Sequence, residues 1–187
     1  RMFKNCTSLQ SIVIPDNIKG IRFNAFFNCS SLKEADLGNG VTSLNEVTTY
    51  GIYWGAIFKD CVSLKKVIIG RSLRYMAREG SEFENCTSLD TVLMTNNNVL
   101  EQIPKNCFKN CSSLKALSIP GSVSSIGSNA FQNTGITVIN LVGSENNLNL
   151  SAGSTVTLGG KSNISIEQNA TIILNTIDKL FIINKSG

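Results

Sequence analysis

Histidine is absent from the 187 residues of this chain, and tryptophan occurs only once. Without an imidazole the chain has no Ser-His or Cys-His nucleophile pair, no histidine general base and no histidine ligand for a metal ion. No other nucleophile pair or set of metal ligands is visible in the sequence. The sequence therefore predicts that the chain is not an enzyme and that it uses no cofactor and no metal.

Long apolar segments and a strong excess of one charge are missing as well. No apolar stretch approaches the roughly 18 residues that a membrane-spanning helix needs. The 17 basic and 13 acidic residues give a net charge of +4, which is small and evenly spread. A surface that binds nucleic acid or anionic lipid needs a stronger basic patch than this. We therefore expect neither nucleic-acid binding nor membrane insertion by this chain.

A seven-residue motif, Phe-x-x-Cys-x-Ser-Leu, is present five times. Its copies begin at Phe3, Phe26, Phe58, Phe83 and Phe108, and a sixth copy without the cysteine begins at Phe131. The steps between these phenylalanines are 23, 32, 25, 25 and 23 residues, so the longest step contains a nine-residue insertion. A unit of about 23 residues cannot bury its own apolar side, but a stack of such units buries a continuous core.

The segments between the motifs predict short strands joined by turns. Ile12 and Ile14 lie two residues apart, which puts both side chains on one face of a strand, and Pro15 ends that strand. Ala25, Phe26 and Cys29 have the spacing of a short helical turn that points inward. The fold class predicted from the residues is a β-rich solenoid.

These motifs resemble the BspA-like leucine-rich repeats, whose consensus contains Ala-Phe, Cys, Ser-Leu and Ile-x-Ile-Pro. The resemblance covers residues 3 to about 141. It implies a leucine-rich repeat solenoid, a right-handed parallel β-rich superhelix with short helical turns. It also implies a non-enzymatic recognition or adhesion module at a cell surface or in a secreted protein, which binds a protein or another host or extracellular macromolecule. The alternative is a structural spacer, or stalk, within a larger protein.

The chain divides into two sections. Residues 1–141 are predicted to form about six repeat units without an N-terminal cap, which indicates a piece of a longer protein, although no signal peptide is visible. Residues 142–187 contain apolar pairs that recur every eight residues, such as Leu148/Leu150, Val156/Leu158 and Ile164/Ile166. We interpret this β-only section as a degenerate continuation of the solenoid, with three eight-residue sides to a coil of 24 residues. An antiparallel meander is the alternative.

Five of the six cysteines share one position of the repeat, and Cys107 replaces the alanine before Phe108. Equivalent residues in neighbouring coils lie about 4.8 Å apart on parallel vectors. A disulfide needs Cβ atoms about 3.8 Å apart on converging vectors. We therefore expect reduced cysteines that pack as small hydrophobic residues, with disulfides and a metal site as the alternatives.

Two further polar patterns are interpreted as structural rather than functional. Seven asparagines lie in N-x-S/T, the acceptor pattern for N-glycosylation: Asn5, Asn28, Asn85, Asn110, Asn163, Asn169 and Asn184. Because asparagine also suits the turn before each cysteine, and four of the seven sites come with the repeat itself, we predict this turn role rather than glycosylation sites. The acidic cluster of Glu79, Glu82 and Glu84 lies close to Arg78 in the sequence. We predict that it lies on a solvated face of mixed charge.

Two regions are candidates for partner binding. The residues between the paired inward positions form an outward column, Val13, Asp36, Ile68, Leu93, Ser118 and Asn140, in which Ile68 and Leu93 should be adjacent. They form part of an apolar patch or, as the alternative, only shield each other. The nine-residue insertion lies within "NEVTTYGIYWGA" and carries Tyr50, Tyr53 and Trp54, which are typical interface residues. We predict a protruding loop around residues 45–55 that binds a partner, the alternative being that Trp54 packs against a neighbouring coil.

Overall fold

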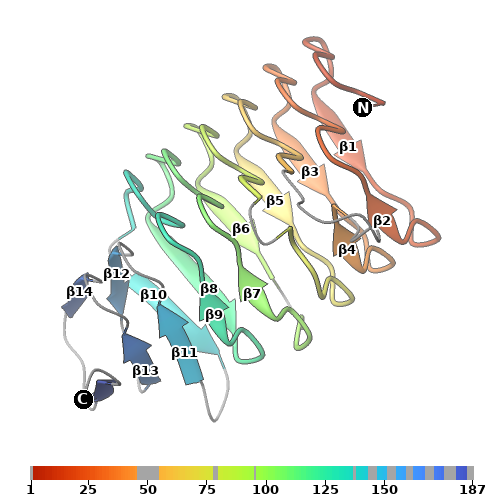
Figure 1. Cartoon of the computed structure of the whole chain (residues 1–187). Helices are drawn as coiled ribbons and strands as arrows, with labels where there is room; N and C mark the ends of the chain where they lie inside the picture. Colours follow the sequence, from red (N-terminus) through yellow and green to blue (C-terminus); the bar gives the residue numbers. More distant parts are fainter. Residues whose placement is uncertain are drawn as a thin grey trace.

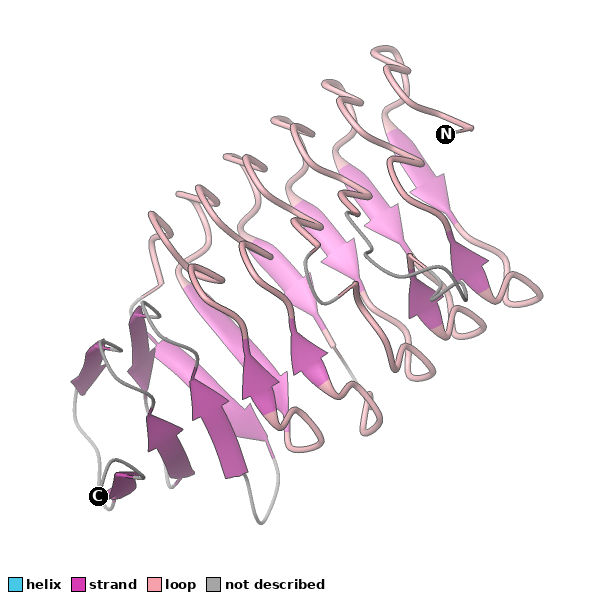
Figure 2. Cartoon of the chain, viewed as in Figure 1, coloured by secondary structure: helices cyan, strands magenta, loops and turns pink. Residues whose placement is uncertain are grey.

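Short strands that stack in parallel from one coil to the next build the structure (Figure 1). The computed structural model describes residues 2–45, 55–77, 80–94, 96–136 and 138–142, and then the strands at 147–150, 155–158, 162–166, 171–174 and 180–184. Among these residues there are strands, turns and loops but no helix (Figure 2). The predicted parallel β-solenoid is confirmed.

The first strands of successive coils form one row (Figure 1). The row contains β1 (Ser11–Val13), β3 (Glu34–Asp36), β5 (Lys66–Ile68), β6 (Thr91–Leu93), β8 (Ala116–Pro120) and β10 (Val138–Val142). β1, β3, β5 and β6 form one sheet, and β8 pairs with β10. Ile12, Ala35, Val67 and Val92 are partners across the ladder. These are the inward positions of the repeat alignment, so the predicted register is correct.

The second strands form another row, in which each is only two residues long until the C-terminal section. They are β2 (Gly20–Ile21), β4 (Ser43–Leu44), β7 (Gln102–Ile103) and β9 (Ser125–Ile126). Tyr75 makes an isolated parallel bridge to Ser43, so the coil between β4 and β7 follows the same path without a full strand. Each coil therefore lines the core with two extended segments, one in each row.

A tight corner joins each second strand to the next first strand. Within one corner the Cys29 N–H donates to the Phe26 carbonyl over 3.2 Å, and the Leu32 N–H donates to the Cys29 carbonyl over 3.0 Å. Between them Asn28 has a positive φ of 56°. A left-handed residue stops a helix from continuing. The predicted helical turns are thus successive hydrogen-bonded turns, and the helical part of the prediction is wrong.

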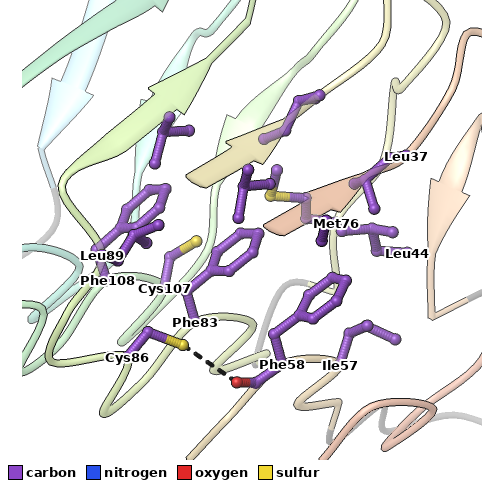
Figure 3. Packing of buried hydrophobic residues seen from close by; sticks show 14 of the residues in the cluster. Leu37, Leu44, Ile57, Phe58, Met76, Phe83, Cys86, Leu89, Cys107 and Phe108 are labelled. Carbon is purple, nitrogen blue, oxygen red and sulfur yellow. Dashed lines mark hydrogen bonds between the residues drawn. The ribbon is translucent and has the colours of Figure 1, made fainter. Parts of the chain in front are cut away.

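The core is a set of columns that run along the stack. Neighbouring phenylalanine rings are nearly parallel, with centroids between 5.1 Å (Phe26 and Phe58) and 5.8 Å (Phe108 and Phe131) apart. The rings of Phe58, Phe83 and Phe108 follow one another through the core (Figure 3). Burying one such side chain contributes about 1.5–3 kcal/mol. As predicted, Leu64, Val67 and Ile69 are buried as well.

The strands after residue 142 are also parallel. They are β11 (Asn147–Leu150), β12 (Thr155–Leu158), β13 (Ser162–Ile166), β14 (Thr171–Leu174) and β15 (Leu180–Asn184). β9, β11, β13 and β15 are neighbours in one sheet, and β12 pairs with β14. The division into two sections at residue 141 stays a prediction.

The coil length predicted for this section is wrong. Ile164 pairs with Leu148, and Ile172 pairs with Val156, so equivalent residues are 16 positions apart (164 − 148 and 172 − 156) rather than 24. Ile182 in turn pairs with Ile164, 18 positions away (182 − 164). Two strand-and-turn units therefore complete a coil here. The reason is that the Phe-x-x-Cys corner, which lengthens the earlier coils, does not occur after residue 142.

Replacing Leu114 by alanine should destabilise the fold by about 2–5 kcal/mol, because Leu114 is fully buried and the change leaves a cavity. Denaturant unfolding measures the effect. Leu93→Ala is the matched control, since Leu93 is partly exposed and should cost about 1 kcal/mol or less. Equal costs at the two positions would contradict the register described above.

Candidate functional site

The cysteine column satisfies backbone carbonyls at the corners. The thiols of Cys29, Cys61, Cys86 and Cys111 each donate to the phenylalanine carbonyl of the preceding coil, Phe3, Phe26, Phe58 and Phe83, over 3.0 to 3.1 Å. Figure 3 shows the bond from Cys86 to the Phe58 carbonyl oxygen. All six cysteines are free thiols. The column therefore has a structural role that needs both the small volume and the weak donor of a thiol.

The environment of the buried cysteines makes them chemically inert. Burial raises the pKa of Cys61 and Cys111 to about 12, and it raises the pKa of Cys86 and Cys107 well above the usual value. A thiol becomes a nucleophile or a metal ligand only as the thiolate. The described residues also contain no cluster of three or more metal-ligating side chains. The prediction of buried, reduced cysteines is confirmed, except that Cys6 in the first coil is half-buried.

The asparagine before each cysteine forms a second column. Asn28 donates its side-chain amide to the Asn5 side chain, Asn110 donates to Asn85, and Asn133 donates to Asn110. Asp60 has no amide to donate and accepts from Asn85 instead. All of these residues have positive φ, which asparagine and aspartate tolerate better than other side chains. The predicted turn role is confirmed for the four sequons of the repeat.

Three other sequon asparagines lie in the C-terminal section. Asn163 is part of β13, Asn184 ends β15, and Asn169 is outside the described residues. The predicted turn is the one before each cysteine, so it does not concern Asn163, which is paired within a ladder.

The outward face of the first row of strands carries the predicted apolar column. Ile68 and Leu93 are direct partners in the parallel ladder, and they alternate with the buried Val67 and Val92. Leu93 is 39% exposed, and Val13 at the start of the column is 69% exposed. The prediction that Ile68 and Leu93 are adjacent and point out of the core is confirmed. Whether they bind a partner stays a prediction.

Polar residues interrupt this column on both sides of the Ile68 and Leu93 pair. Asp36 lies between Val13 and Ile68, and its carboxylate accepts the Gly38 N–H over 2.9 Å. Ser118 follows on the exposed side of β8. The Ile68 and Leu93 pair is thus a short apolar segment with a polar residue on either side.

The three aromatic residues of the insertion, Tyr50, Tyr53 and Trp54, lie outside the described residues, as do Arg78 and Glu79. The predicted binding loop and the packing alternative for Trp54 therefore stay predictions. Tyr75, which the sequence did not single out, is 43% exposed on the second row, and the Arg74 guanidinium lies 5.2 Å from its ring centre. Arg74 also bonds Glu101 over 2.8 Å.

Glu82 overturns the prediction of a solvated acidic cluster. Its side chain has no exposed surface, whereas Glu84, two residues later, is bonded to Lys59 over 2.7 Å at the edge of the core. Glu82 occupies the position before Phe83 that alanine fills before Phe26 and Phe131. The repeat alignment therefore contained the signal, because that position points inward. Glu82 accepts hydrogen bonds from the Asn45 side chain and the Ile57 N–H.

Comparisons with known proteins agree with this architecture. The profile of a family described as "BspA type Leucine rich repeat region" matches residues 1–53 and 55–155 in six copies. No protein with a curated description matches the chain. In the described residues there is no helix long and apolar enough to cross a membrane.

Two solved structures are similar to the chain. A leucine-rich repeat protein of T. pallidum shares 21% identity with a TM-score of 0.62, over 93% of this chain and 73% of that one. A leucine-rich cell surface protein of Faecalibacterium prausnitzii shares 27% identity with a TM-score of 0.55, over 78% of this chain and 34% of that one. This chain thus matches about a third of the second protein's length.

Thiol titration of the native chain near pH 8 should give at most one readily reactive group, from the half-buried Cys6. The buried thiols remain protonated and inaccessible at that pH because burial raises their pKa. In denaturant without reductant all six cysteines should react. Cys6→Ser should remove the native reactivity and leave five groups in denaturant. Fewer than six titratable thiols in the denatured parent chain would mean that disulfides form.

Proposed function

This chain belongs to the BspA-type leucine-rich repeat family, and on that premise we propose that it is a non-enzymatic recognition module. Its partner is a protein or another extracellular macromolecule, and its location is the cell surface or the extracellular space. Repeats of this family are scaffolds that bind proteins in general. The described residues offer no chemistry that competes with this function, since five of their six cysteines are buried and their one fully buried carboxylate is inaccessible to a substrate.

One observation supports the proposal most directly. Ile68 and Leu93 are adjacent on the outward face of a sheet, at a position that is not part of the buried core. The neighbouring coils place Asp36 and Ser118 at the same position. Exposed apolar residues that cluster on a rigid face are a usual feature of binding surfaces. The similar cell surface protein of Faecalibacterium prausnitzii supports the proposed location.

The proposed site has two parts. The first is the Ile68 and Leu93 pair, and the second is the insertion with Tyr50, Tyr53 and Trp54. Solenoid insertions gather on one face, often the binding face, and tyrosine and tryptophan supply much of the energy of interfaces. The adhesion role that the family resemblance implies belongs to this proposal.

Replacing both Ile68 and Leu93 by aspartate should weaken binding at least about tenfold, because two charges would have to be desolvated in the interface. Partners are first selected by surface binding of the parent chain to a panel of purified extracellular proteins. Val62→Asp is the matched control, since Val62 is a similarly exposed apolar residue at a corner outside the proposed site. Undiminished binding by the double variant would exclude this face, and a chain that binds nothing in the panel would favour the spacer.

Deletion of residues 46–53 should weaken binding while the thermal midpoint changes little. The deletion removes two of the three aromatic residues proposed for the contact. It keeps Asn45 and Ile57, which are bonded to Glu82 in the core. Binding and thermal unfolding are measured on the same preparation. A large fall in the thermal midpoint would show that the insertion belongs to the scaffold and would overturn its assignment to the site.

A further inference from the structure

Two neighbouring coils have insertions at the same corner. Five positions lead from Ile126 to Phe131 in the regular repeat, whereas fourteen lead from Leu44 to Phe58 and seven lead from Met76 to Phe83. The two coils therefore carry nine and two extra residues between the second strand and the phenylalanine column. Glu82 lies directly before Phe83, at the end of the shorter insertion.

The carboxyl group of Glu82 is bonded to the ends of both insertions. The Asn45 side-chain amide, which precedes the longer insertion, donates to Oε1 over 2.7 Å. The Ile57 N–H, which follows that insertion, donates to Oε2 over 3.0 Å. The Ala77 N–H, which precedes the shorter insertion, also donates to the carboxyl group. Three donors from two coils thus meet at one buried acid.

No basic side chain among the described residues takes part in this cluster. Burial raises the pKa of Glu82 and the three hydrogen bonds lower it, and the net result is a pKa of about 7. The titratable group that faces Glu82 from the following coil is the Cys107 thiol, whose own pKa is raised well above its usual value by burial. Cys107 is therefore neutral wherever Glu82 titrates.

Asn45 carries the hydrogen-bond acceptor that a protonated Glu82 needs. Asn45 is 6% exposed, and its Oδ1 atom is buried without a hydrogen-bond partner. Rotation of the amide by half a turn exchanges Oδ1 and Nδ2, because an amide presents an acceptor on one side and donors on the other. The acceptor then lies where the donor was, within reach of a carboxyl hydroxyl.

Two glycines leave room for the cluster. A Cβ atom on Gly55 would lie 1.9 Å from Asn45 Nδ2, and a Cβ atom on Gly80 would lie 2.7 Å from Glu82 Oε1. Both glycines flank the insertions. The backbone of these glycines thus lies close against the Asn45 and Glu82 side chains.

We propose that Asn45 and Glu82 form a proton-binding switch that joins the ends of the two insertions. When the carboxyl group is ionised, Asn45 Nδ2 donates to it. When the carboxyl group takes a proton from solvent, its hydroxyl donates to Asn45 Oδ1 after the amide has rotated. Each state has its own set of bonds, so acidification changes the connection between the two coils without unfolding them.

The test is an NMR titration of the intact, isotopically labelled chain between about pH 5 and about pH 9. The Glu82 carboxyl carbon should titrate near pH 7, and the side-chain amide signals of Asn45 should follow with the same midpoint. Both transitions should vanish in Glu82→Gln. Glu84→Gln is the matched control, because Glu84 pairs with Lys59 and Lys109 instead, and this variant should leave both transitions unchanged.

A Glu82 midpoint outside the range of about 6 to about 8 overturns the switch, because ordinary glutamates titrate near 4.3. The switch is also overturned if the Asn45 signals do not follow the titration of Glu82, or if a transition persists in Glu82→Gln. If the glutamine variant does not fold, the two coincident transitions of the parent chain and of Glu84→Gln decide the question alone.

The pH dependence of stability provides a second measurement. Between pH 4.5 and about 7 the folded chain keeps Glu82 protonated while the unfolded chain ionises it. The parent chain should therefore lose stability relative to Glu82→Gln as the pH rises through this window. The expected change in the ratio of the two unfolding constants is roughly a hundredfold. A ratio that stays constant with pH would contradict the proposal.

Discussion

The structure depends on one constraint, which is that each coil takes its hydrogen-bond partners from the coils on either side at a single strand spacing. The constraint acts at the corners as well as in the strands. The Phe26 N–H donates to the Ile57 carbonyl of the next coil, and the Cys61 thiol of that coil donates back to the Phe26 carbonyl. Backbone groups that a compact turn leaves unpaired are thus satisfied by the neighbouring coil. Every position then faces its own equivalent one coil away.

The columns of like residues are consequences of this repetition. Phenylalanines stack with nearly parallel rings because their backbones are parallel. Asparagine amides form a ladder because an amide offers a donor on one side and an acceptor on the other. Asp60 marks the limit of that rule, since a carboxylate accepts from Asn85 but has nothing to donate. A cysteine suits the corner for a related reason, as it is small, apolar and still a donor.

The sequence predicted those features that repeat and missed those that depend on a neighbouring coil. Inward and outward positions, such as Val67 and Ile68, followed from alternation and from the spacing of the repeats. The burial of Glu82 did not, because acidic residues in sequence are normally solvated and its bonding partners come from Asn45 and Ile57, 37 and 25 residues away. The helical turns were wrong because spacing alone does not reveal the positive φ of Asn28. The C-terminal coil length was wrong because eight-residue strand pairs are compatible with coils of 16 or 24 residues until the pairing is known.

The same constraint separates the residues that specify the fold from those that are free to serve function. A side chain that points inward must match its equivalents in the adjacent coils, so its type is restricted along the whole stack. A side chain that points outward, or an insertion that leaves the corner, meets no such condition. The outward column accordingly changes from Val13 to Asp36, Ile68, Leu93 and Ser118, while the inward columns remain apolar. Among the buried residues that the structure describes, Glu82 is the one carboxylate, and it occurs in a coil with an insertion and beside another such coil. Two insertions and a buried carboxylate therefore occur together at one corner of two neighbouring coils. None of these features is required by the stacking of the repeats.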